Sequence, residues 1–423
     1  MIAQFTVSEP SWNKYNGQMS SVPPARSIRV GALDSILTLT CFLSPDSLVH
    51  RAYLRVPRES YQMNSKSRPK TEPRDSVLAR LMLGFEGEVL PSELAGYLAR
   101  GLAGVVIYQR NFSSVQRLLE LTLSIRKAAG RSVLIGIDQE GGTRFALREP
   151  FTAWPSAAEL GRLGDAGAVE RVARAMATEL RAAGCNLDFA PMLDLHVNLQ
   201  SPVTKDRSFG SDPNLVGKLG AAFHRGLHSG GVLSCAKHFP GHGDASVDPH
   251  LELPVFAGTM ERLESTELVP FRAVIAEGVP LVMTAHILLP QIDPAFPASL
   301  SRTILDGILR RRLHFNGVIL ADDLGMGAIA RRYGPGESAV ETLLAGTDIA
   351  MLCHDWTAVV PAIAAVTQAR QRGLFDEEEW RASHARIDQA LDLAEWPEPR
   401  PSLEVLGCEE HRKLANEIRA RLR

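Results

Sequence analysis

From Val77 onward, short apolar runs alternate along the chain with longer amphipathic segments. In the segment 166–183, Val169, Val172 and Met176 share one face with other apolar residues at a spacing of 3.6, which predicts a helix. The apolar runs are short enough to be buried strands. There are eight of them: 78–85, 104–108, 133–137, 185–189, 232–236, 281–285, 317–321 and 348–352.

Eight buried strands separated by helices predict an α/β protein whose single catalytic domain, residues 74–398, is a closed (β/α)₈ barrel of the TIM type. A doubly wound parallel sheet is the alternative. No Gly-x-Gly-x-x-Gly motif opens a helix after the first strand, which argues against that alternative. We therefore favour the barrel.

The two ends of the chain have other patterns. Residues 1–73 mix turn formers with isolated apolar residues and end in a polar stretch that contains proline, so we expect a poorly ordered extension or linker. Residues 399–423 are expected to form a C-terminal helical tail. These boundaries leave one domain large enough to carry chemistry.

Composition excludes several classes of function. The 423 residues include 46 Lys and Arg and 48 Asp and Glu, a net charge of −2, which offers no basic surface for nucleic acid or an anionic membrane. The apolar run 35–43 is far shorter than the roughly 18 residues of a membrane span, and the opening residues lack the basic region of a secretory signal. Five scattered cysteines are typical of free thiols. We expect a monomeric cytoplasmic protein with neither a nucleic-acid nor a membrane partner.

Ionisable residues follow five of the predicted strands. Because active sites of such barrels collect at the carboxyl ends of the strands, this pattern predicts a polar catalytic mouth. No phosphate-cradling Gly-x-x-x-x-Gly-Lys-Ser/Thr motif is present. The residues concerned are Asp138, Asp194, His196, Lys237, His238, His286, Asp322 and Asp323.

The segment 237–250 is the densest in such groups, with three histidines, two aspartates and a lysine. His238, His242, Asp244 and His250 are possible metal ligands. Pro240 and the glycines at 241 and 243 prevent the helix that an i, i+4 ligand pair would use. We therefore expect no metal, and interpret the segment as a catalytic loop that carries a general acid/base.

Asp248 and His250 are two residues apart, with Pro249 between them. Because proline favours an extended residue before it, we expect both side chains on the same side of an extended segment. Asp248 would then orient the imidazole and favour its protonated form. A surface histidine without a role is the alternative.

Asp322 and Asp323 close the seventh predicted strand. A carboxylate nucleophile there would suit a retaining glycosidase. A metal ligand pair, or a helix cap at Asp323, is equally compatible with the residue types, and spacing alone does not identify the attacking residue.

Seven motifs lie in order along the predicted barrel, and together they resemble glycoside hydrolase family 3. More narrowly, they resemble the bacterial β-N-acetylglucosaminidases of peptidoglycan recycling (NagZ type). The most specific of them is the loop KHFPGHG with its Asp-x-His, which is absent from the larger β-glucosidases of the family. The motifs are IDQEGG (137–142), FAPMLD (189–194), DRSFGSDP (206–213), KHFPGHG with DPH (237–243 and 248–250), MTAH (283–286), PASLS (297–301) and VILADDLGM (318–326).

The resemblance implies a retaining exo-β-N-acetylglucosaminidase acting on a muropeptide fragment, with no metal or organic cofactor. It assigns Asp322 as the nucleophile, His250 as the acid/base and Asp248 as its partner. It also implies that the N-acetylglucosamine unit is bound by Asp138, Arg207, Lys237 and His238.

Two positions depart from the family pattern. Relatives usually continue with Arg-Val-x-Arg after the Glu-Gly-Gly, whereas the second arginine is replaced here by Ala146. Arg144 or Arg148 would have to supply that charge. Pro249 stands where serine is common, and we expect it to stiffen the loop.

Three alternatives remain from the sequence. A β-N-acetylglucosaminide phosphorylase would use phosphate in place of water, because an imidazole repels an anion less than a carboxylate does. A non-catalytic amino-sugar-binding protein would fit the arginine lost at Ala146. A metal-dependent hydrolase would be stopped by a chelator.

Overall fold

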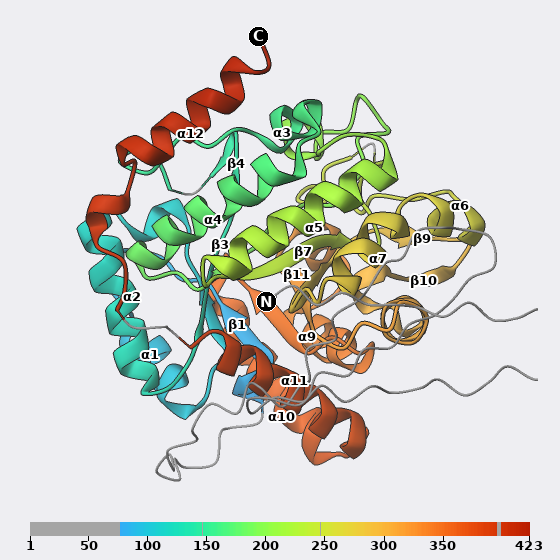
Figure 1. Ribbon diagram of the computed structural model, residues 1–423. Coiled ribbons are helices and arrows are strands. Elements are labelled where there is room, and N and C mark those ends of the chain that lie inside the picture. Colours follow the sequence, from blue (N-terminus) through green and yellow to red (C-terminus); the bar gives the residue numbers. More distant parts are fainter. Residues whose placement is uncertain (1–76, 146, 246, 396–398) are drawn as a thin grey trace, which may run out of the picture. The chain divides into compact units, whose positions relative to one another are not determined.

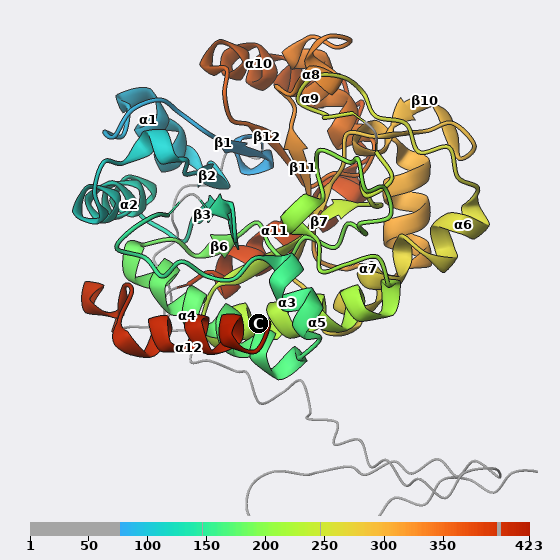
Figure 2. The same ribbon diagram turned by 90° about the horizontal axis from the view of Figure 1, so that it is seen from above.

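The computed structural model describes residues 77–145, 147–245, 247–395 and 399–423. The expected N-terminal extension, residues 1–73, and Ala146 lie outside the described residues. Eight parallel strands form a closed barrel, as predicted, in the order β1-β12-β11-β8-β7-β6-β3-β2 (Figures 1 and 2). The strands are β1 (Leu81–Leu83), β2 (Gly104–Val106), β3 (Leu134–Ile137), β6 (Leu187–Asp188), β7 (Leu233–Phe239), β8 (Leu281–Thr284), β11 (Val318–Asp323) and β12 (Ile349–Leu352).

The barrel closes between its first and last strands. Leu81 is in register with Ala350 and Leu83 with Leu352, and the backbone N–H of Gly84 continues the ladder to the carbonyl of Leu352. Because every barrel strand has a neighbour on each side, the barrel presents no unpaired edge.

Helices surround the barrel and connect its strands (Figure 2). The larger ones are α1 (Ser92–Arg100), α2 (Val115–Ala129), α4 (Ala166–Ala183), α5 (Pro213–Ser229), α7 (Leu268–Ala276), a π-helical segment (Thr303–Arg312), α9 (Pro335–Leu344), α10 (Val359–Gln371), α11 (Glu377–Leu393) and α12 (Glu409–Ala420). Shorter elements on the loops are the helices α3 (Ala157–Leu163), α6 (Met260–Ser265) and α8 (Gly327–Ala330), and the hairpins β4–β5 (Gln139–Gly141, Arg144–Phe145) and β9–β10 (Leu288–Leu289, Asp293–Pro297).

Helix α4 has the bounds that its periodicity predicts, and local chemistry explains both ends. The carboxylate of Asp165 accepts the backbone N–H of Ala168 at 3.1 Å, an N-cap. Gly184 ends the helix with φ of +94°, where a Cβ would lie 1.9 Å from Oγ1 of Thr122. The apolar face, including Val169 and Leu180, is fully buried. Each such side chain contributes roughly 1.5–3 kcal/mol, so packing on the barrel outweighs intrinsic helix propensity.

Two layers of apolar side chains make the core. One lies between the strands and the helices around them, and the other fills the interior of the barrel with residues such as Phe189, Met283 and Met351. Helix α11 contributes Ile387 and Leu391 to the interior layer. Figure 2 shows this helix across one end of the barrel. The filled interior leaves the strand ends at the other mouth as the place for a pocket.

The expected C-terminal tail contains helix α12, which packs against α3 and α4. The fully buried carboxylate of Glu179 accepts hydrogen bonds from the backbone N–H of Gly407 at 3.0 Å and from Nδ1 of His411 at 2.8 Å. It also accepts the Oγ1–H of Thr152 at 2.6 Å and the indole N–H of Trp154 at 3.3 Å. One carboxylate thus ties the tail to the segment that follows the β4–β5 hairpin.

Candidate active site

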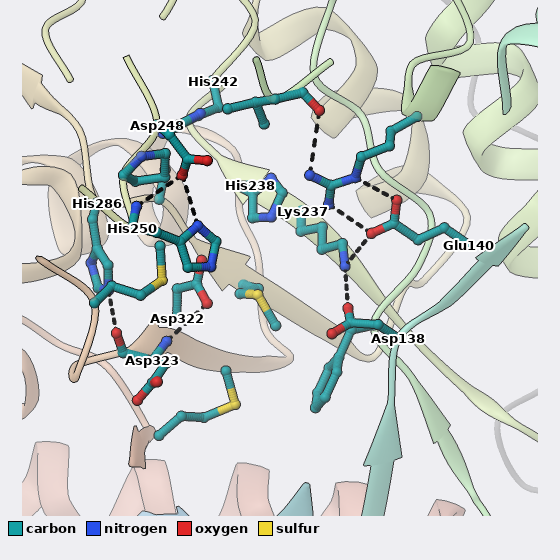
Figure 3. A pocket seen from close by; sticks show the side chains of 18 of the residues that line it. Asp138, Glu140, Lys237, His238, His242, Asp248, His250, His286, Asp322 and Asp323 are labelled. Atoms are coloured by element: carbon teal, nitrogen blue, oxygen red, sulfur yellow. Dashed lines mark hydrogen bonds and ion pairs between the residues drawn. The ribbon is translucent and has the colours of Figure 1, made fainter. Parts of the chain in front are cut away.

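The carboxyl ends of the barrel strands surround a cavity of about 320 Å³. This volume is in the range of sites for small molecules. Figure 3 shows the polar side chains that converge on it. The seven residues to which the family resemblance assigns a role all line it: Asp138, Arg207, Lys237, His238, Asp248, His250 and Asp322.

The paired aspartates of β11 have different surroundings. The carboxylate of Asp323 is buried and accepts hydrogen bonds from the backbone N–H of Gly325 at 3.1 Å, the backbone N–H of Cys353 at 3.0 Å and Nδ1 of His354 at 2.7 Å. Within the described residues, the carboxylate of Asp322 accepts a single hydrogen bond, from the backbone N–H of Asp323 at 2.8 Å. Asp322 is therefore the one with an oxygen available to a ligand.

Asp322 is held in its ionised form. Burial acts to raise its pKa, but the imidazoles of His286 and His238 and the N–H of Asp323 outweigh burial and hold the pKa below its usual value. His286 is itself fixed, because its Nε2–H donates to the carbonyl of Asp323 at 3.0 Å and its Nδ1 accepts from Ser299 at 2.7 Å. An ionised, partly exposed carboxylate at a strand end has the properties of a nucleophile.

The side chains of Asp248 and His250 are in contact, with Nδ1 of His250 at 2.7 Å from Oδ1 of Asp248 (Figure 3). The expected extended backbone is wrong, because residues 249–251 form a turn. The carboxylate of Asp248 also accepts the backbone N–H of His250 at 2.9 Å, the hydrogen bond of an Asx turn. A local side-chain bond, not strand alternation, brings the pair together.

The loop that carries this pair rests on α8, just after the strand of Asp322. The backbone N–H of Gly327 donates to the carbonyl of His250 at 3.2 Å, and that of Ala328 to the carbonyl of Pro249 at 3.0 Å. A Cβ on Gly327 would lie 2.5 Å from the carbonyl oxygen of His250, so glycine permits this close approach. The His250 side chain is 59% exposed. The imidazole is therefore anchored through its backbone and open to solvent at its ring.

A buried network of charges forms another wall of the pocket. Nζ of Lys237 lies 2.5 Å from Oδ1 of Asp138 and 2.6 Å from Oε1 of Glu140. Arg207 forms two parallel hydrogen bonds with Glu140, at 2.7 and 2.8 Å. Burial acts to raise the pKa of Glu140, but Arg207 and Lys237 hold it well below its usual value. Burial acts to lower the pKa of Lys237, and the two carboxylates outweigh that effect and raise it.

Glu140 is the member of this network that the sequence analysis missed. It lies within the motif 137–142, but its partner Arg207 is 67 residues away. Without it, Arg207 would lose its ion-pair partner and the buried Lys237 would keep only Asp138.

Two histidines of the loop 237–243 are oriented by Asp194, which is fully buried. Asp194 accepts Nδ1–H of His238 at 2.6 Å and the backbone N–H of His242 at 2.7 Å. His242 is also buried, and neither of its ring nitrogens has a hydrogen-bond partner among the described residues. Burial lowers the pKa of His242 to about 4, so this imidazole is neutral at pH 7.

The lining of the pocket differs from the sequence analysis at a few positions. His196 binds Thr204 at 2.7 Å and does not line the pocket. Tyr108 and His354, which the sequence analysis did not select, do line it. Ala146 lies outside the described residues, and Arg148 does not line the pocket.

In the described part of the chain, no cluster of three or more His, Cys, Asp or Glu is arranged to hold a metal ion. Of the four possible ligands, His238 and His250 use Nδ1 to bind aspartates, and Asp244 pairs with Arg262 at 3.6 Å. Across the same residues, every helix is too short or too polar to cross a bilayer. Cys185, Cys235, Cys353 and Cys408 are free thiols.

A barrel whose pocket is lined by an available carboxylate and an Asp–His pair is compatible with a glycoside hydrolase, and comparison with known proteins identifies the family. Residues 89–390 match the model of the glycosyl hydrolase family 3 N terminal domain. The chain belongs to glycosyl hydrolase family 3, as the motifs predict, and is a glycoside hydrolase acting on O-glycosyl bonds.

Among curated relatives, a beta-hexosaminidase of Nitrosospira multiformis is 36% identical over 313 residues, 70% of this chain and 89% of the relative. A beta-hexosaminidase of Neisseria meningitidis serogroup C is 40% identical over 260 residues, 60% of this chain and 72% of the relative.

Solved structures agree. A family 3 β-N-acetylglucosaminidase from a Paenibacillus species superposes with a TM-score of 0.77 at 35% identity, covering 81% of this chain and 67% of that one. NagZ from Neisseria gonorrhoeae, in complex with N-trifluoroacetyl-D-glucosamine, superposes with a TM-score of 0.69 at 32% identity, covering 81% and 97%.

Proposed function

We propose that this protein is a retaining exo-β-N-acetylglucosaminidase that removes terminal β-linked N-acetylglucosamine. The observation that carries the proposal is the environment of Asp322, whose carboxylate is ionised and available in the pocket that the Asp248–His250 pair also lines. The names of the beta-hexosaminidase relatives and of the β-N-acetylglucosaminidase structures support the same activity.

In the first step, a carboxylate oxygen of Asp322 bonds to the anomeric carbon while the bond from that carbon to the leaving oxygen breaks. His250 gives its proton to the leaving oxygen. In the second step, His250 takes a proton from water, the water oxygen bonds to the anomeric carbon, and Asp322 is released. The sugar therefore leaves with the configuration it had in the substrate.

Asp248 orients the imidazole of His250. Its carboxylate lies 2.7 Å from Nδ1 and orients the ring, which leaves Nε2 of His250 for proton transfer. Because the pair lies on a solvent-exposed loop, the proton can also be exchanged with water between turnovers.

The charged wall supplies the binding groups. Asp138 is about 43% exposed and faces the pocket, so it can accept hydroxyl hydrogens of the sugar. Lys237, Arg207 and His238 offer donors, and their positions are held by Glu140 and Asp194. A site prepared in this way binds the sugar without reorganising.

The motif resemblance supports a finer assignment. We infer that the natural substrate is N-acetylglucosaminyl-β-1,4-anhydro-N-acetylmuramic acid, with or without its peptide, and that the enzyme acts as a monomer in the cytoplasm. The unpaired thiols Cys185, Cys235 and Cys353 support a reducing compartment. Incubation with this disaccharide and analysis of the released sugars tests the substrate, and fractionation of producing cells tests the location.

The decisive experiment measures release of nitrophenol from p-nitrophenyl N-acetyl-β-D-glucosaminide by the wild type and by Asp322→Asn. We expect hydrolysis by the wild type and a loss of at least about 10³-fold in kcat in the variant. Asp323→Asn is not a neutral control, because that carboxylate holds Cys353 and His354. Near-wild-type rates in Asp322→Asn would contradict the assignment, and saturable binding without turnover would indicate an amino-sugar-binding protein.

A phosphorylase is the second candidate, favoured by one observation. The proposed acid/base is the imidazole of His250, which repels an incoming phosphate less than a carboxylate at the same place would. Assays in phosphate and in a phosphate-free buffer distinguish the two. Formation of N-acetylglucosamine 1-phosphate in the phosphate buffer would show that the enzyme is a phosphorylase.

A further inference from the structure

The pocket contains a second Asp–His pair, which the proposed mechanism does not use. Nδ1 of His354 lies 2.7 Å from Oδ2 of Asp323, and His354 follows strand β12 at the rim of the barrel. The side chain of His354 is 52% exposed and lines the pocket.

Two contacts orient this imidazole, and a third supports one of its two partners. Its Nδ1 edge is bound to Asp323, which is itself fixed by two backbone N–H groups. Its ring packs on Tyr108, with ring centroids 4.8 Å apart. The guanidinium of Arg110 lies 4.3 Å from the centroid of the Tyr108 ring and supports it. Because Nδ1 donates to the carboxylate, Nε2 is left as an acceptor at the exposed edge.

The walls of the pocket differ in how many hydrogen bonds they can make. The wall from β3 to β7 carries Asp138, Lys237, His238 and Arg207. The wall from β11 through β12 to β2 carries Met326, Met351 and Tyr108, whose hydroxyl is engaged with Cys353. Among the described residues, His354 is the polar side chain of that second wall besides the two aspartates and the engaged hydroxyl of Tyr108.

A hexosamine ring has a matching asymmetry. With the anomeric carbon at Asp322, one edge carries the acetamido group and the hydroxyls of carbons 3 and 4. The other edge carries the ring oxygen, carbon 5 and the single hydroxyl of the hydroxymethyl group. Buried or shielded polar groups need partners, so the edge with many groups suits the wall with many donors and acceptors.

We propose that His354 is a specificity-determining residue whose Nε2 accepts a hydrogen bond from the hydroxymethyl O–H at carbon 6 of the terminal sugar. The proposal rests on the proposed function for the position of the anomeric carbon. It makes the Asp323–His354 pair a binding element that distinguishes sugars with a 6-hydroxyl from those without it.

The test compares binding of N-acetylglucosamine and of its 6-deoxy counterpart by isothermal titration calorimetry, so that it does not depend on turnover. The proteins are the wild type, His354→Phe, which keeps an aromatic ring beside Tyr108, and His354→Gln, which keeps an acceptor. His196→Phe is the matched control, because His196 also binds a neighbour through Nδ1 but lies outside the pocket lining.

We expect the wild type and His196→Phe to bind the 6-hydroxy sugar roughly tenfold more tightly than the 6-deoxy sugar. In His354→Phe the ratio should fall to near one, and His354→Gln should recover part of it. A ratio that is unchanged in His354→Phe, or a wild type that binds the two sugars equally or binds neither, overturns the proposal. Because the readout is a ratio of two sugars on one protein, general loss of folding does not mimic the result. Absence of hydrolysis in the nitrophenol assay would instead contradict the proposed function alone.

Discussion

Two parts of the pocket hold charged groups in opposite ways. Lys237 and Glu140 are buried and Arg207 is largely so, and each charge is paired with another member of the network. Asp248 and His250 are paired on a loop, with the imidazole 59% exposed. We therefore expect the charged wall to contribute to the stability of the fold, whereas the exposed Asp248–His250 pair should be replaceable without disturbing it. Stability and catalysis should therefore respond to different substitutions.

The largest effect is expected from Glu140→Gln. Removing this carboxylate takes away the ion-pair partner of Arg207 and leaves Lys237 with Asp138 alone, which costs about 3–5 kcal/mol of unfolding free energy. Urea unfolding measures the loss. Glu120→Gln is the control, because the exposed pair of Glu120 with Arg117 contributes at most about 1 kcal/mol. Equal stability of the two variants would mean that the wall is not part of the core.

His250→Ala tests the other side of the comparison. We expect kcat to fall by roughly 10²–10⁴-fold for substrates with poor leaving groups, because the leaving oxygen no longer receives a proton. The loss should be much smaller for nitrophenyl substrates, and the urea midpoint should stay at the wild-type value. A large drop in stability would show that the loop supports the fold as the charged wall does.

A smaller effect concerns the pH dependence of stability and the buried His242. Its pKa is about 4 in the folded protein and 6.5 in a free chain. Between these values the unfolded chain takes up a proton that the folded protein does not, so stability falls as pH decreases from about 6.5 to 4. Between pH 7 and 5 this residue should account for about 2 kcal/mol.

His242→Gln should therefore lose less stability than the wild type between pH 7 and 5, measured by urea unfolding at each pH. His228→Gln, at an exposed position, should lose as much as the wild type. If the unfolding free energies of His242→Gln and of the wild type change equally with pH, the imidazole is protonated in the folded protein and has a partner.

The sequence predicts the barrel well because its signals are local. All eight strands overlap the apolar runs, and α4 has the predicted bounds, since burial on both faces of a strand and one face of a helix leaves a short-range pattern. The hairpins β4–β5 and β9–β10 were not predicted, because two to five residues are too few to show a period.

The position of a polar residue directly after a strand was enough to predict that Asp322 and Lys237 lie at the mouth of the barrel, where both line the pocket, whereas their roles came from the family resemblance and stay predictions. Glu140 and His354 were missed because their meaning lies in partners 67 and 31 residues away. Spacing also could not identify which of Asp322 and Asp323 has an available carboxylate oxygen. That depends on which carboxylate already accepts hydrogen bonds from backbone N–H groups.

The pairing of β1 with β12 has a consequence for how the protein is made. A ribosome delivers Leu81–Leu83 long before Ile349–Leu352, so the nascent chain carries an open strand edge until almost all of the described barrel has emerged. During that interval the edge is available to other chains. The partners of Asp323, Cys353 and His354, emerge in the same late stretch. The same late stretch therefore closes the open edge and braces the strand that carries Asp322 and Asp323.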